Sequence, residues 1–148
     1  MSRRAKPRSV LSITLTVPAR LSTATISRWA SQARRRLAAP PGDLSIVTVS
    51  SPRSRQLNRQ YRHRDYPTNI LSFSFSPSDQ TNTAQPWGEI VLCPAVIRRQ
   101  AGQWSRTYRQ HFRALLEHGL LHLLGYDHRT TIEQRRWNRL EKKLHAHH

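Results

Sequence analysis

The sequence contains one cysteine, Cys93, and one methionine, Met1, among 148 residues. A single cysteine excludes an internal disulfide, which is typical of proteins in a reducing compartment. No run of 18 apolar residues is present, so no transmembrane helix is expected. The apolar stretch 10–17 is short and is interrupted by Ser and Thr, which argues against an export signal. These absences predict a soluble cytoplasmic protein that does not enter a membrane.

Acidic residues are also scarce, because eight Asp and Glu stand against 25 Lys and Arg, for a net charge of +17. Such a charge attracts polyanions and repels basic partners. Arginine outnumbers lysine, and its planar guanidinium suits phosphate. A solvated cationic surface or adhesion to a membrane is the simpler alternative, but the composition favours a nucleic acid as the partner.

The chain length is that of one domain. Residues 1–9 carry four basic residues and no acid, which predicts a mobile basic arm. Residues 10–144 are expected to form a single folded domain. Residues 145–148 form a histidine-rich tail that could bind metal opportunistically.

Hydrophobic periodicity divides this domain into alternating strands and helices. Strands are predicted at 10–17, 44–49, 70–75 and 89–92, and helices at 22–37, about 51–62, 94–100 and about 105–124. A capping box at Thr130–Glu133 opens a last helix, whose apolar face comprises Ile132, Trp137, Leu140 and Leu144. This order predicts an α+β fold in which helices cover a mixed, mostly parallel sheet of about four strands.

Three histidines occur within one short run, His118, His122 and His128. The first two are one helical turn apart, about 6 Å along the axis, and share a helix face. Gly125 is suited to a positive φ at the helix end, so that the chain could turn back and supply His128. Three imidazoles predict one zinc ion whose fourth coordination position is open to water. Water bound to zinc at such a position has a pKa of roughly 7.

Other interpretations of these histidines are weaker. Two histidines at this spacing could be packed core residues, but three followed by a helix-ending glycine favour a metal site. Metzincin proteases share the ligand spacing. They place a glutamate after the first ligand, where this chain has Gly119, and they need a methionine turn, which Met1 cannot supply.

The run 117–128 resembles the signature of the YbeY-type endoribonucleases, which are zinc-dependent rRNA maturation factors. The blocks 57–73 and 88–93 resemble two further characteristic stretches of that family, in the same order. Two features depart from the family pattern. Glu89 stands where aspartate is usual, and Arg129–Thr131 stands where acidic residues are common, which makes the entrance to the site more basic.

The resemblance implies the function and several residue roles. Arg62 matches an arginine of the family active site and would act with His118 in cleavage of single-stranded rRNA. Independently of the resemblance, Asp127 lies between the second and third histidines, where it could orient a histidine Nδ1–H or simply cap the turn. The partners implied are rRNA of the small ribosomal subunit and ribosome-associated proteins. The alternative is a non-catalytic ribosome-assembly factor with a structural zinc, for which only Cys93 could supply a fourth sulfur ligand.

Overall fold

The computed structural model describes residues 9–40, 42–74, 86–126 and 128–145. Most of the predicted basic arm, all but the first residue of the predicted tail, and Asp127 lie outside these residues. His145, the first residue of that tail, is the last residue of a helix. The elements are β1 (Leu11–Leu15), α1 (Thr23–Arg36), β2 (Asp43–Thr48), α2 (Ser51–Arg62), β3 (Ile70–Ser74), β4 (Pro86–Leu92), α3 (Pro94–Gln103), α4 (Tyr108–Leu123) and α5 (Thr131–His145).

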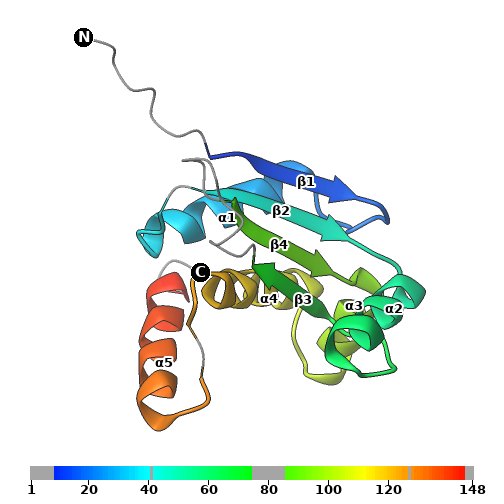
Figure 1. The fold of residues 1–148 in the computed structure, drawn as a ribbon. Helices are drawn as coiled ribbons and strands as arrows, with labels where there is room; N and C mark the ends of the chain where they lie inside the picture. The colour runs from blue at the N-terminus through cyan, green and yellow to red at the C-terminus, as the bar shows by residue number, and fades with distance from the viewer. Residues whose placement is uncertain (1–8, 41, 75–85, 127, 146–148) are drawn as a thin grey trace.

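The four strands form one mixed sheet in the order β1-β2-β4-β3 (Figure 1). β1 pairs with β2 and β2 with β4 in parallel, whereas β3 runs antiparallel to β4. Side chains alternate between the two faces of β1. Leu11, Ile13 and Leu15 pack against the main core, whereas Ser12 and Thr14 are exposed. The predicted α+β fold with a mostly parallel sheet is confirmed.

The main core lies between one face of the sheet and the helices α1 and α4. Fully buried side chains there include Ile46 and Ile90 from the sheet, Ile26 from α1, and Phe112 and Leu116 from α4. α5 contacts both α1 and α4 (Figure 1). α4 is therefore the central helix of the domain, packed against strands on one side and helices on others.

α4 begins three residues later than the sequence predicted. Ser105 has a φ of +52°, which a helix does not allow. The helix then starts after Thr107, whose side chain accepts from Gln110 N at 3.1 Å while the Gln110 side chain accepts from Thr107 N at 3.2 Å. This capping box sets the first turn and hence the phase of the histidines along α4.

The capping box predicted for α5 is present, because Thr130 Oγ1 accepts from Glu133 N at 3.1 Å and Glu133 Oε2 accepts from Thr130 N at 3.2 Å. The predicted apolar face of α5 is partly wrong. Ile132 is 77% exposed, whereas Trp137 is 3% exposed and Leu144 is fully buried. Only the middle and end of α5 reach the core, so its first turn projects into solvent.

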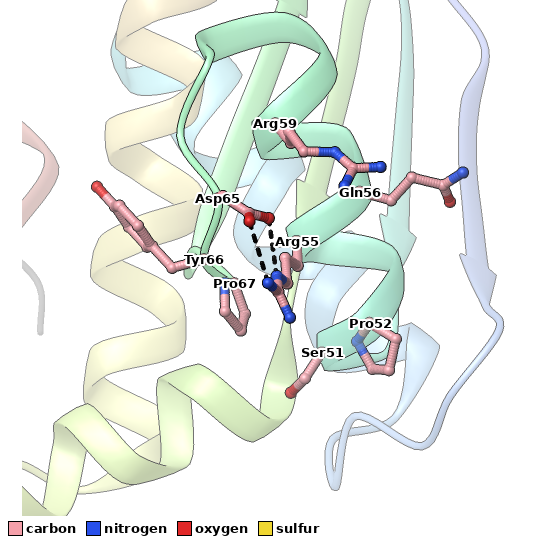
Figure 2. Close-up of a pocket in the computed structure, with 8 residues that line it drawn as sticks. All are labelled: Ser51, Pro52, Arg55, Gln56, Arg59, Asp65, Tyr66 and Pro67. Atoms are coloured by element: carbon pink, nitrogen blue, oxygen red, sulfur yellow. Dashed lines mark hydrogen bonds and ion pairs between the residues drawn. The ribbon is translucent and has the colours of Figure 1, made fainter.

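α2 lies against the other face of the sheet, over a smaller core that includes Leu57, Leu71 and Val91. His63 adopts a left-handed conformation with φ 58° and ends α2 at Arg62, as predicted. The chain then folds back along α2, where Arg55 forms two hydrogen bonds with Asp65 at 2.8 and 3.1 Å (Figure 2). This pair borders an open cavity of about 750 Å³ between α2 and the segment that follows it.

No helix in the described part of the chain combines the length and apolar character needed to cross a membrane.

Candidate metal centre

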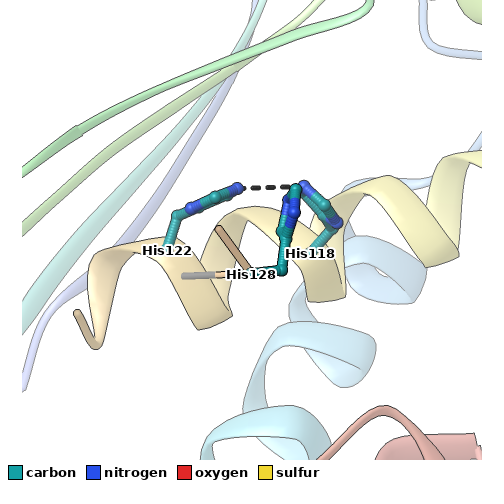
Figure 3. A group of neighbouring side chains, drawn as sticks. All are labelled: His118, His122 and His128. Atoms are coloured by element: carbon teal, nitrogen blue, oxygen red, sulfur yellow. Dashed lines mark hydrogen bonds between the residues drawn. The ribbon is translucent and has the colours of Figure 1, made fainter. Parts of the chain in front are cut away.

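The three predicted histidines lie together at the end of α4 (Figure 3). The ring nitrogens His118 Nε2 and His122 Nε2 are 3.0 Å apart. One ligand atom from each of His118, His122 and His128 lies within 4.8 Å of the others. Among the residues that the structure describes, no other group of His, Cys, Asp and Glu converges in this way. The three imidazoles could hold one metal ion.

Gly125 makes the turn that returns His128 to the helix. Its φ is +88°, and it follows the C-cap residue of α4. Gly125 N donates to His122 O at 3.0 Å and Tyr126 N donates to Leu121 O at 3.1 Å. These two bonds form a Schellman motif, which satisfies the last carbonyls of the helix. The predicted role of Gly125 is thereby confirmed, whereas Asp127 lies outside the described residues.

Trp137 of α5 packs against all three histidine rings. Its ring centroid lies 4.7 Å from that of His118 and 5.0 Å from those of His122 and His128. The indole Nε1 donates to Glu141 Oε1 at 2.8 Å, one turn further along α5. α5 therefore supplies a fixed aromatic surface that limits how the imidazoles can rotate.

The environment keeps His118 uncharged at neutral pH. Burial, together with the neighbouring His122 and His128, lowers the pKa of His118 from 6.5 to about 4. A neutral imidazole has the lone pair that a metal requires, so binding would not have to displace a proton from this ring. The donor set therefore fits a divalent metal that prefers nitrogen ligands.

A cavity of about 410 Å³ opens beside two of the histidines. It is lined by His118 and His122, by Arg62 at the end of α2, and by Glu141 of α5. Arg62 is exposed at the cavity, and its charge contributes to the lowered pKa of His118. The tertiary structure thus brings together the two residues, Arg62 and His118, for which the resemblance implies catalytic roles.

His111 also lines this cavity, but it is held away from the three ligands. Its Nε2 lies 3.0 Å from Gln100 Oε1, and Asn69 Nδ2 donates to the same oxygen at 2.9 Å. Burial and the nearby Arg106 lower the pKa of His111. His111 is therefore not part of the converging histidine group.

Two other residues with metal-binding side chains lie elsewhere. Cys93 is buried in the small core under α2, with its Sγ 3.8 Å from Ser51 Oγ. His63 is exposed at the end of α2 and does not line the metal cavity. Neither supplies a fourth ligand in this arrangement.

Gly119 marks a close approach of α4 to the sheet. A Cβ placed there would lie 2.9 Å from Ile70 Cδ1 and 3.1 Å from Ser72 Oγ. A side chain at this position would press on Ile70 and Ser72, two sheet residues that also line the cavity beside His118 and His122. Packing therefore favours glycine at position 119, and glycine has no side chain that could act as the base of a protease.

A family model described as endoribonuclease YbeY matches residues 13–148 of this chain. The chain belongs to the YbeY endoribonuclease family. An endoribonuclease YbeY from Pseudomonas putida is 37% identical over 123 residues, which cover 83% of this chain and 78% of the relative. One from Alkalilimnicola ehrlichii is 38% identical over 128 residues, covering 83% and 75% respectively.

The fold is also similar to a solved structure. The solution structure of a protein from Thermotoga maritima matches with a TM-score of 0.59, covering 91% of this chain and 89% of that one. The two sequences are 20% identical, so this similarity concerns the fold alone.

For this YbeY-family protein, the sequence did not reveal several residues that contact the histidines or line the cavity beside them. Trp137 was assigned only to the apolar face of the last helix, and Glu141 was not considered. The signal was present, since Glu141 follows Trp137 by one helical turn and therefore shares its face. Trp104 and Arg106, from the connection between α3 and α4, also line the cavity and had no recognisable motif.

Proposed function

We propose that this YbeY-family endoribonuclease binds one zinc ion through His118, His122 and His128 and cleaves single-stranded rRNA during ribosome maturation in the cytoplasm. Family membership makes the chain an RNA-cleaving hydrolase with a role in rRNA processing. The observation that carries the proposal is that Arg62 lines the same cavity as His118 and His122, two of the three converging histidines. The catalytic domain would comprise residues 10–144.

Zinc is the metal that these ligands favour. Neutral imidazole nitrogens suit zinc, and a site with three histidines matches the usual number of protein ligands in catalytic zinc sites. Zinc held in this way supplies a Lewis acid with an open position and lowers the pKa of water there to about 7. Trp137 and Glu141 hold the imidazoles in place for it.

Arg62 is suited to bind the phosphate that is cleaved. Its guanidinium is permanently charged and can donate two hydrogen bonds to phosphate oxygens. Because Arg62 of α2 and His118 of α4 line the same cavity, a phosphate that contacts both would be held at the histidine group. Charge that develops on its oxygens during cleavage would be stabilised by Arg62.

The alternative of a purely structural zinc is less well supported. A structural zinc is normally enclosed by four protein ligands. Among the described residues only three ligands converge, and two of them line an open cavity of about 410 Å³. An assembly factor would have no need of an open coordination position next to a cationic cavity.

The test is cleavage of a single-stranded rRNA fragment by protein freed of metal and then reloaded with zinc. We expect cleavage of the single strand, little cleavage of the same sequence in a duplex, and loss of activity with a chelator. His118→Ala should be inactive, while the matched control His145→Ala, at the far end of α5, should be active. Undiminished cleavage by His118→Ala would overturn the proposal.

A further inference from the structure

Trp104 is an exposed tryptophan on the wall of the metal cavity. It is 53% exposed, whereas Trp29 and Trp137 are each 3% exposed. It lines the same cavity as Arg62, Arg106 and His118. A large indole left in solvent beside a catalytic site is a candidate surface for a flat ligand.

The backbone around Trp104 holds it in a defined position. Trp104 N donates to Gln100 O at 2.9 Å and Arg106 N donates to Ala101 O at 3.0 Å, which closes the end of α3. Between them Ser105 takes a φ of +52°, so the chain reverses sharply. Two neighbouring side chains, Trp104 and Arg106, thereby reach the same cavity.

The indole is also supported from within the cavity. Its ring meets His111 edge to face, with centroids 5.1 Å apart and an interplanar angle of 81°. His111 is in turn fixed by Gln100, to which Asn69 also donates. Trp104 therefore packs against a side chain that is itself held by hydrogen bonds. The indole would lose little conformational entropy when it binds a ligand.

The positive charges around the indole are complementary to the negative phosphate of a nucleotide. Arg106 lies near enough to His111 to lower its pKa, and Arg62 stands on another wall of the same cavity. Single-stranded RNA offers a π face on every base and a negative charge on every phosphate. Aromatic side chains combined with basic residues are the usual means of binding it.

We propose that Trp104 stacks on a nucleobase of single-stranded RNA while Arg106 binds the adjoining phosphate. This inference rests on the proposed function, because the cleaved phosphate is taken to lie at Arg62 and His118. His111, beneath Trp104, precedes His118 by seven residues of α4, about 10 Å along the axis. The stacked base therefore belongs to a nucleotide near the cleaved bond, on one side of it.

The proposal gives a structural reason for selecting single strands. In a duplex each base is covered on both faces by its neighbours, so none is available to an indole unless it is unstacked. Stacking is tolerant of sequence, since every base has a π face. Trp104 should therefore select unpaired RNA without selecting a particular base.

The experiment compares RNAs in which one nucleotide at a time lacks its base. A single-stranded RNA with one cleavage site is cut by zinc-loaded protein, and kcat/KM is measured for each abasic position. For the wild type we expect one position near the cut where loss of the base lowers kcat/KM about 10-fold or more. Trp104→Ala should lose this dependence, and Trp104→Phe should retain most of it.

Ile132→Ala is the matched control, because it removes an exposed apolar side chain from the outer side of α5. It should keep the wild-type profile. Unchanged thermal unfolding of Trp104→Ala shows that the variant is folded and as stable as the wild type. The inference is overturned if Trp104→Ala keeps the wild-type abasic profile, or if the wild type has no sensitive position.

A second measurement separates this inference from the proposed function. Binding of the same RNAs to metal-free protein requires no cleavage. A base-dependent affinity that disappears in Trp104→Ala supports the stacking site even if the wild type cleaves no RNA, which would contradict the proposed function alone. Equal affinities of the wild type and Trp104→Ala for all of the RNAs overturn the stacking site.

Discussion

Trp137 Nε1 donates a hydrogen bond to Glu141 Oε1 at 2.8 Å, and the ring so fixed lies against all three histidines of the metal group. The donor and acceptor are one turn apart on α5, while two of the histidines belong to α4. Docking of α5 on α4 is thus coupled to the geometry of the site. A binding site and the packing of the C-terminal helix depend on the same indole.

Trp137→Leu is expected to weaken zinc binding about 10- to 100-fold, the range seen when groups that orient metal ligands are removed. The leucine keeps an apolar side chain in the core but provides neither the ring nor the N–H. Zinc affinity can be measured by competition with a coloured chelator. Glu133→Gln, at the start of the same helix, is the control and should bind as the wild type does. Equal affinities of Trp137→Leu and the wild type would show that the indole only fills space.

Replacement of His118, His122 and His128 together by alanine should abolish stoichiometric zinc binding. The variant is made in a chain ending at residue 144, so that the histidine-rich tail cannot contribute metal. Elemental analysis of the purified protein should find about one zinc in the shortened parent and none in the variant. One equivalent of zinc in both would disprove the assignment of the three ligands.

Arg62→Ala should slow cleavage on the order of 100-fold or more at saturating enzyme, as when a group that stabilises transition-state charge is removed. Zinc content and overall RNA affinity should change little, because Arg62 is one cation among 25. Arg62→Lys should recover little activity, since an ammonium cannot replace the planar guanidinium.

The measurement for Arg62 is single-turnover cleavage of a labelled RNA. Arg59→Ala is the matched control, because Arg59 lies on the same helix but lines the cavity beside Arg55 and Asp65 (Figure 2), which none of the three histidines lines. Wild-type rates for Arg62→Ala under these conditions would remove Arg62 from the mechanism.

Without metal, the Glu117→Gln variant should gain stability relative to the wild type as the pH rises. Glu117 is 3% exposed, and burial raises its pKa from 4.5 to about 7 despite Arg113 and Arg36, whose charges oppose the shift. Between these values the unfolded chain has released the proton that the folded chain keeps. Stability contributed by the protonated carboxyl is therefore present below pH 4.5 and is lost as the pH rises through about 7.

Urea unfolding in the presence of a chelator measures this effect at pH 5 and pH 8. The difference in stability between Glu117→Gln and the wild type should shift in favour of the variant at the higher pH. Glu89→Gln, on β4, serves as the control and should show no such shift. A difference between Glu117→Gln and the wild type that does not change with pH would contradict the burial argument.

Much of the fold was predictable because it depends on local patterns. Alternation at 10–17 and 44–49 identified β1 and β2, and helical spacing identified α1 and the body of α4. The start of α4 was misplaced, since the positive φ of Ser105 has no signature in a non-glycine residue. The exposure of Ile132 was also not predictable from the sequence. Periodicity shows which residues share a helix face, but not how much of that face the neighbouring elements cover.

By itself the sequence determined the histidine group, because spacing along one helix and a glycine at its end fix where the imidazoles can point. It also determined the family, through motifs that lie in a fixed order along the chain. Only the tertiary structure decided what surrounds that group. The surrounding side chains come from α2, from α5 and from the connection between α3 and α4, namely Arg62, Trp137, Glu141 and Trp104. Their positions beside the histidines depend on long-range packing, which no local pattern in the sequence encodes.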